Sequence, residues 1–274
     1  TVVPEDDETL LDNAQTSYNY AAPGAHRYHI DLILAKKLLD DEVCKRGKPQ
    51  EVSIDRPDPL MIDRLHKDEY FILTCALFSY GNAKAIVSFL SDLDATWIDM
   101  DEDYIEKALE GHYYRFQSNE DVVQWFKTVK RMKKYGPLYD IFFNAYVQNK
   151  SLIDGLNALI KAIYEANNYR SKGYEFLIGK PVLKISTASA MKRWMMFFRW
   201  MVRDQENDLG HWKCIPTEDL IMPLDVHTSR VSRKLGLLNR KQTDLRAAIE
   251  LTEQLKQFDP KDPLKYDFAL YRIG

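Results

Sequence analysis

Apolar residues recur every three or four positions along most of the chain, which is the spacing of one face of an α-helix. In one stretch Ala85, Ile86, Phe89 and Leu90 follow Asn82, whose side chain can cap the first turn of a helix. The same pattern predicts helices over residues 29–39, 68–78, 82–93, 102–109, 121–132, 138–147, 151–166 and 189–202, and two more that begin near residues 225 and 244.

The alternating runs that are typical of β-strands do not occur, because valine and isoleucine are scattered along the chain. Glycine and proline instead mark loops at residues 136–137, at Gly173 and at residues 179–181. Residues 44–59 contain charges and three prolines and are typical of a connection. The pattern therefore predicts an all-α fold of about ten helices.

Charge is unevenly distributed along this chain of 274 residues, whose formal net charge is -3. Residues 1–60 carry 7 Lys/Arg against 12 Asp/Glu, whereas residues 184–246 carry 12 Lys/Arg against 7 Asp/Glu. A local basic surface on a mildly acidic protein suits nucleic acid. Ordinary solvated helix faces explain the same counts equally well.

Composition also excludes several classes of protein. No run of 18 or more apolar residues occurs, so we expect no membrane partner. Thr1 begins an acidic, polar stretch that lacks the pattern of a signal peptide. Three widely spaced cysteines cannot complete a four-thiolate zinc or iron–sulfur site, and we expect neither a metal nor a cofactor. The scarcity of cysteine favours a cytoplasmic protein.

Residues 223–227 read PLDVH and precede a predicted helix, so Asp225 taken alone is simply a good N-cap. The string resembles the segment of the helix-hairpin-helix DNA glycosylase superfamily that carries the invariant aspartate of the active site. In this resemblance Asp225 matches the aspartate, and His227 matches the residue two places further on.

The bifunctional members of that superfamily carry a lysine at the start of a helix upstream of the aspartate. Lys192 matches this lysine, because it opens an apolar helix and lies 33 residues before Asp225. The long interval, and the string ISTA (residues 185–188) in place of a glycine-rich hairpin, resemble the archaeal 8-oxoguanine DNA glycosylase branch.

Asp267 and Tyr271 lie four residues apart near the C-terminal end and share one helix face. In 8-oxoguanine glycosylases a polar or acidic residue that touches the base lies four before an aromatic residue that stacks on it. The resemblance implies these base-binding roles for Asp267 and Tyr271, with Met196 as the opposite wall of the pocket. Without the resemblance, Asp267 and Tyr271 are more simply explained as part of a packed terminal helix.

A further set of motifs is FSYG (78–81), FRWMVR (198–203), DLGHW (208–212), PLDVH (223–227) and KYDFAL (265–270). Through these motifs residues 58–274 resemble, more narrowly, an uncharacterised bacterial family, DUF2400. The wider superfamily implies two helical lobes that flank a cleft. In this chain we expect the lobes to be a central bundle over residues 67–203, which ends in the hairpin–helix segment, and a second lobe of residues 26–66 and 204–274. Residues 1–25 lack hydrophobic periodicity, so we expect a loosely ordered arm there.

The resemblance implies a DNA glycosylase with abasic-site lyase activity, and 8-oxoguanine is the expected lesion. Lys192 would attack the sugar and form a Schiff base, while Asp225 would stabilise positive charge on the sugar. The damaged base must first be flipped out of the double-stranded DNA. His227, Arg230 and Arg233 follow Asp225 on one helix and are the candidates for phosphate binding.

Two alternatives stay open at this point. One is a glycosylase for another lesion, such as an alkylated or deaminated base. The other is a non-catalytic module that binds a DNA structure on the same helical scaffold. In each case we expect a monomer that acts on DNA in the bacterial cytoplasm, associated with the nucleoid.

Overall fold

The computed structural model describes residues 32–46, 59, 66–205 and 208–273. The predicted arm over residues 1–25 lies outside these residues. The α-helices are α2 (Leu32–Arg46), α4 (Glu69–Phe78), α5 (Ala83–Ser91), α6 (Glu102–Ala108), α7 (Asn119–Lys133), α8 (Leu138–Asn149), α9 (Leu152–Ala166), α10 (Lys172–Ile178), α11 (Lys192–Val202), α12 (Val226–Lys234), α13 (Leu245–Lys256) and α14 (Asp267–Ile273). The 3₁₀ helices are η2 (Ala95–Asp99), η3 (Ile185–Thr187), η4 (Thr217–Asp219) and η5 (Pro263–Tyr266).

The described residues form no β-strand, only two isolated β-bridges, and the predicted all-α class is confirmed. Local capping explains several helix ends. The Asn82 side chain accepts a hydrogen bond from the backbone N–H of Lys84 and starts α5, as the sequence predicts. One predicted end is wrong, because the helix expected to stop at residue 39 continues to Arg46. Leu39 and Val43 lie one turn apart and both pack against the core there.

Gly173 was predicted to lie in a loop, but it lies inside α10. Its role is close packing. A Cβ atom at this position would lie 2.3 Å from a carboxylate oxygen of Asp121 and 2.5 Å from the carbonyl oxygen of Phe116. The absence of a side chain therefore allows α10 to lie directly against the start of α7, at the modest cost of a glycine within a helix.

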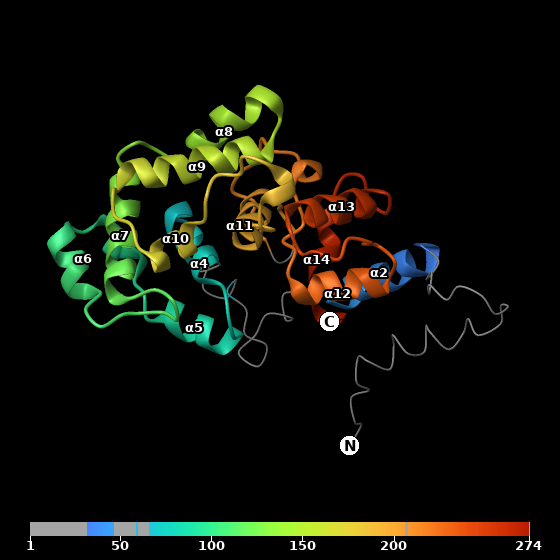
Figure 1. The fold of residues 1–274 in the computed structure, drawn as a ribbon, viewed down its shortest axis with the longest axis horizontal. Coiled ribbons are helices and arrows are strands. Elements are labelled where there is room, and N and C mark those ends of the chain that lie inside the picture. Colours follow the sequence, from blue (N-terminus) through green and yellow to red (C-terminus); the bar gives the residue numbers. More distant parts are fainter. Residues whose placement is uncertain (1–31, 47–58, 60–65, 206–207, 274) are drawn as a thin grey trace, which may run out of the picture.

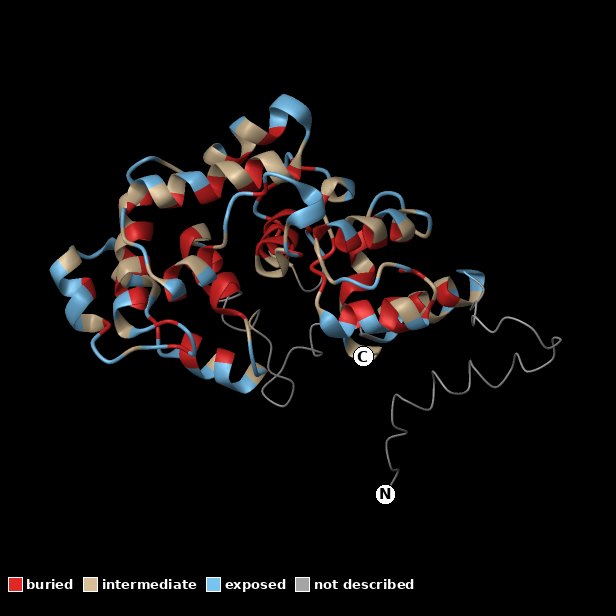
Figure 2. Ribbon diagram, viewed as in Figure 1, coloured by how far each residue is buried: buried red, intermediate tan, exposed pale blue. Residues whose placement is uncertain are grey.

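A large hydrophobic core is built around α4 and α11. Every residue of α4 from Tyr70 to Phe78 is buried, as expected for a helix that is apolar on all sides. α11 packs against α4 and contributes Trp194, Phe197 and Trp200 to the same core. Figure 2 shows both helices as buried ribbon surrounded by partly exposed helices.

A second, smaller core joins α2, α12, α13 and α14. In Figure 1 these four helices lie to the right of α11, whereas α4 to α10 lie to its left or above it. Met222 and Leu224, in the segment just before α12, are buried in this second core. α11 thus occupies the position where the two groups of helices meet. The division of the chain at residue 203 stays a prediction.

Candidate active-site cavity

Lys192 and Asp225 are in direct contact, although 33 residues separate them in the sequence. The Nζ atom of Lys192 donates a hydrogen bond to Oδ2 of Asp225 at 2.6 Å. Lys192 is the first residue of α11, and Asp225 is the N-cap of α12. The ion pair therefore joins the beginnings of two helices that belong to different cores.

Two local features of the backbone position this pair, one at the start of each helix. Asp225 uses its other carboxylate oxygen, Oδ1, to accept a hydrogen bond from the backbone N–H of Thr228 at 2.8 Å. It is thus a helix cap and an ion-pair partner at once. Met191 enters α11 in the left-handed region with φ 51°, which is a strained conformation for a residue with a side chain. This turn sets the direction in which α11 presents Lys192.

The electrostatics keep Asp225 negatively charged. Burial by itself raises the pKa of its carboxyl group, but the Lys192 ammonium and the hydrogen bonds from Lys192 and Thr228 outweigh it, so the pKa lies below its ordinary value. The side chains of Lys192 and Asp225 retain 35% and 19% of their exposure. The pair is therefore partly shielded but still accessible to a ligand.

Lys192 and Asp225 open into a cavity of about 140 Å³. Its walls come from both groups of helices, because the α4–α5 junction lies on one side and α12 and α14 on the other. The lining combines aromatic and apolar side chains with several polar or charged ones. Besides Lys192 and Asp225, the lining includes Ser79, Tyr80, Gly81, Met196, Arg199, Trp200, Pro223, Thr228, Asp267, Phe268 and Tyr271.

The three residues expected to bind a base all line this cavity. Met196 is half-buried on α11, and the ring centroid of Tyr271 lies 6.0 Å from Nζ of Lys192. Asp267 is buried, and its Oδ2 accepts a hydrogen bond from the Arg199 guanidinium. Burial raises the pKa of Asp267, against the opposing effect of Arg199. One carboxylate oxygen of Asp267 is thus already engaged before any ligand arrives.

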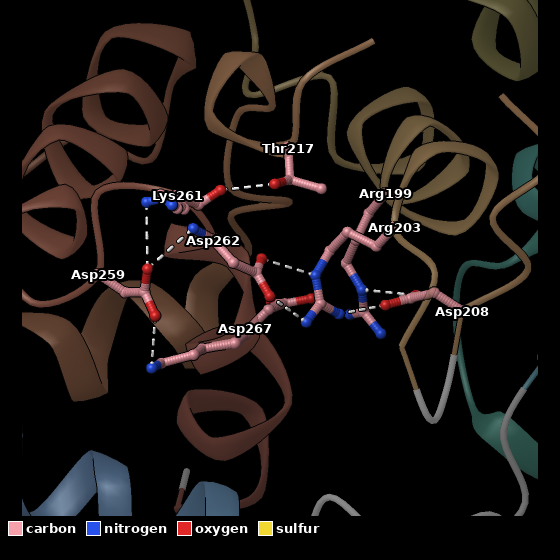
Figure 3. A network of polar contacts seen from close by, with 9 residues as sticks. Arg199, Arg203, Asp208, Thr217, Asp259, Lys261, Asp262 and Asp267 are labelled. Atoms are coloured by element: carbon pink, nitrogen blue, oxygen red, sulfur yellow. Dashed lines mark hydrogen bonds and ion pairs between the residues drawn. The ribbon is translucent and has the colours of Figure 1, made fainter. Parts of the chain in front are cut away.

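Arg199 belongs to a buried ion network at the far end of α11, part of which Figure 3 shows. Arg199 and Arg203 both donate to Asp208, whose side chain is completely buried. Arg203 also donates to both carboxylate oxygens of Asp262 at 2.8 Å. Asp267 completes the network. These contacts fasten the loop after α11 and the start of α14 to α11 itself.

The motifs along the chain did not predict this network. Arg199 and Arg203 stand four residues apart, hence on one face, in a segment rich in Met, Phe and Trp, and this was the available signal. Two arginines on a buried helix demand carboxylate partners. The partners are Asp208, Asp262 and Asp267. They lie in segments outside α11, so the pattern of residues along that helix could not identify them.

The three candidates for phosphate binding differ in their surroundings. His227 and Arg230 are exposed on α12 next to Asp225. Arg233 instead donates through Nε to the carbonyl oxygen of Arg240 and through Nη2 to that of Lys241, both at 2.8 Å. These bonds hold the loop that follows α12, so Arg233 is the weakest of the three candidates.

No group of three or more His, Cys, Asp or Glu side chains in the part of the chain that the structure describes is arranged to hold a metal ion. None of its helices combines the length and the apolar character needed to cross a bilayer.

The fold and the cavity together define an all-helical protein with a lysine–aspartate pair at the mouth of an aromatic pocket. The model of the DUF2400 family, described as a protein of unknown function, matches residues 58–274. The chain therefore belongs to this family, as its motifs predict. No curated protein and no solved structure matches the chain significantly. The wider resemblance to helix-hairpin-helix glycosylases stays a prediction.

Proposed function

We propose that this protein is a DNA glycosylase with abasic-site lyase activity, built as two helical lobes around a cleft. The observation that carries the proposal is the 2.6 Å contact between Lys192 Nζ and Asp225 Oδ2 at the mouth of an aromatic cavity. A nucleophilic amine beside a carboxylate is the pair that breaking a glycosidic bond and forming a Schiff base requires.

The cavity also suits a single base. Its volume of about 140 Å³ is well below the roughly 300–1,000 Å³ of pockets for drug-sized ligands. Trp200, Phe268 and Tyr271 supply aromatic and apolar walls, and Asp267, which Arg199 holds in place, supplies an acceptor. We infer that a flipped purine, with 8-oxoguanine as the leading substrate, occupies the cavity while its sugar lies at Lys192 and Asp225.

The proposed reaction begins when the Lys192 ammonium releases one proton to solvent and the resulting neutral amine attacks C1′ of the sugar. The bond from Nζ to C1′ forms, the glycosidic C1′–N bond breaks, and its electron pair leaves with the base, which takes up a proton. The anionic Asp225 stabilises the positive charge that develops on the sugar. The lysine nitrogen then loses a proton, the sugar ring opens to a Schiff base, and loss of a C2′ proton expels the 3′ phosphate.

Borohydride trapping tests this proposal, because reduction of a Schiff base links protein and DNA covalently. We expect trapping with a duplex that contains 8-oxoguanine, complete loss in Lys192→Gln, and unchanged trapping in the control Lys184→Gln. Lys184 is exposed and lies eight residues earlier. Trapping that persists in Lys192→Gln contradicts the role of Lys192.

A panel of lesions separates the remaining alternatives. Trapping or excision with an alkylated or deaminated base, but not with 8-oxoguanine, would keep the chemistry and change the substrate. Tight binding of damaged duplex by the wild type without excision or trapping of any lesion would identify a non-catalytic DNA-binding protein instead.

A further inference from the structure

Three aromatic rings form an exposed cluster outside the cavity. We call Tyr80, Phe116 and Phe176 the aromatic platform. Phe116 and Phe176 are 61% and 43% exposed, which is unusual for two large apolar side chains in mutual contact. The ring centroids of Phe116 and Phe176 lie 5.1 Å apart, as do those of Tyr80 and Phe176. Tyr80 and Phe116 are parallel with centroids 6.0 Å apart.

The backbone holds Phe116 firmly in this exposed position. Phe116 lies in a tight turn closed by two backbone hydrogen bonds between Tyr114 and Gln117, of 3.1 and 2.9 Å. The Gln117 side chain donates to the carbonyl oxygen of Gly173 at 2.8 Å and so fastens the turn to α10. Arg115, the other residue at the tip, adopts a left-handed conformation with φ 53°. Such strain in a well-anchored turn is typical of a recognition element.

Two guanidinium groups flank the platform. The Cζ atom of Arg115 lies 5.7 Å from the ring centroid of Tyr80 and 5.8 Å from that of Phe116. The Cζ atom of Arg193 lies 5.1 Å from the Tyr80 ring and 4.9 Å from the Phe176 ring. Burial lowers the pKa of Arg193 to about 10, so this guanidinium stays positive at neutral pH. An exposed aromatic surface with fixed positive charges is complementary to a nucleic acid.

The platform is continuous with the cavity. Tyr80 and the adjacent Gly81 line the cavity that contains Lys192 and Asp225, while the Tyr80 ring also touches Phe116 and Phe176. Arg193, the residue after Lys192, donates to the carbonyl oxygens of Leu77 and Phe176. A nucleic acid whose sugar lies at Lys192 therefore extends over Tyr80 toward the platform.

We propose that the aromatic platform stacks on an unpaired nucleobase next to the nucleotide in the cavity, with Arg115 on the neighbouring phosphate. The inference rests on the proposed function only in taking a nucleic acid as the ligand. Its consequence is a preference for nucleic acids with an unpaired base over a fully paired duplex, independent of any lesion. Phe116 and Arg115 determine this preference and take no part in bond breaking.

Fluorescence anisotropy with undamaged oligonucleotides tests the proposal. The probes are a fully paired duplex and the same duplex with one extra, unpaired adenine. We expect Phe116→Ala to weaken binding of the second probe by about 5-fold to 100-fold, the range that base stacking contributes. Binding of the first probe should change less than about twofold, because phosphate contacts dominate there.

Tyr113→Ala is the matched control. Tyr113 is 70% exposed and lies three residues before Phe116. The Tyr113→Ala variant should bind both probes as tightly as the wild type does. A second variant, Arg115→Gln, should lower the slope of log affinity against log salt by about 0.9, the value for one phosphate contact. Equal effects of Phe116→Ala and Tyr113→Ala, or unchanged binding in Phe116→Ala, would overturn the proposal.

The outcome is distinguishable from failure of the proposed chemistry, because these probes contain no lesion. A wild-type protein that shows no preference for the unpaired base but keeps borohydride trapping overturns the platform and keeps the glycosylase. A wild-type protein that shows the preference without trapping keeps the platform and overturns the enzyme. Unchanged oligonucleotide binding combined with a loss of self-association in Phe116→Ala would assign the platform to a protein contact and contradict the inference.

Discussion

The two ends of α11 carry ion pairs of very different character. At its beginning, Lys192 meets Asp225 through one short contact, and the two side chains remain 35% and 19% exposed. Toward its end, Arg199 and Arg203 share Asp208, and these side chains are 7%, 9% and 0% exposed. The same helix therefore presents one accessible pair and one enclosed network.

The difference in burial suits the two groups of charges to different roles, one structural and the other in binding substrate. Charges that are buried and bonded several times are held in one geometry, and removing one partner leaves an uncompensated charge in the interior. A partly exposed pair contributes little to stability, because water screens it. Lys192 can thus exchange its contact with Asp225 for a contact with substrate at low cost, whereas Arg199 cannot leave Asp208 without disturbing the core.

Asp208→Asn should produce the largest loss of stability, about 3–5 kcal/mol, since two buried guanidinium groups lose their shared carboxylate. Urea unfolding measures this value. Asp204→Asn is the control, because Asp204 pairs with Lys213 on the surface with 71% of its side chain exposed. It should change the free energy of unfolding by less than about 1 kcal/mol. A similar loss of unfolding free energy in both variants would contradict the structural role of the buried network at the end of α11.

Asp225→Asn should lower excision by about 10²-fold to 10³-fold, because an amide cannot stabilise positive charge on the sugar. The helix should persist, since asparagine is an equally good N-cap. Single-turnover excision measures the effect. Asp244→Asn serves as the control, because Asp244 caps α13 in the same way and accepts from the N–H of Ala247 at 2.9 Å. Full excision by Asp225→Asn would reduce Asp225 to a helix cap.

The stability difference between wild type and Asp225→Asn should depend on pH. The folded-state pKa of Asp225 is lowered, since Lys192 and Thr228 outweigh its burial. Its stabilising effect, about 1 kcal/mol or less, is therefore complete above the ordinary pKa and disappears as the pH falls through the folded-state pKa. Unfolding of both proteins between neutral and strongly acidic pH measures this difference. A difference that grows on acidification would contradict the ion pair.

The smallest expected effect is a difference in the salt dependence of DNA binding between Arg230→Ala and Arg233→Ala. Arg230 is exposed on α12, so its loss should lower the slope of log DNA affinity against log salt by about 0.9. Arg233 is engaged by backbone carbonyl groups of residues 240 and 241, so its loss should leave that slope nearly unchanged. Anisotropy titrations at several salt concentrations measure both slopes. Equal slopes in the two variants would exclude Arg230 as a phosphate contact.

Much of the candidate site was predictable from its motifs. The PLDVH string identified Asp225, the interval from Lys192 resembled a known pair, and Met196, Asp267 and Tyr271 were placed around one pocket. All five do line one cavity. The FRWMVR motif contains Arg199 but does not show that Arg199 engages Asp267, because an ion pair between residues 68 apart leaves no periodic trace along the chain.

The helical class and the signals that start and stop helices follow from local stretches of the amino-acid sequence. Asn82 and Asp225 cap helices through contacts within three residues, and such contacts are encoded wherever those residues occur. Which distant segments meet depends instead on how the helices pack. From the sequence, Gly173 is predicted to lie in a loop, but in the structure it allows α10 to pack closely against α7. Lys192 is one of many lysines in the sequence, and only the packing of two helix starts brings its Nζ within 2.6 Å of Asp225. Local propensity acts over one turn, whereas pairing across the core depends on how the whole chain buries its apolar surface.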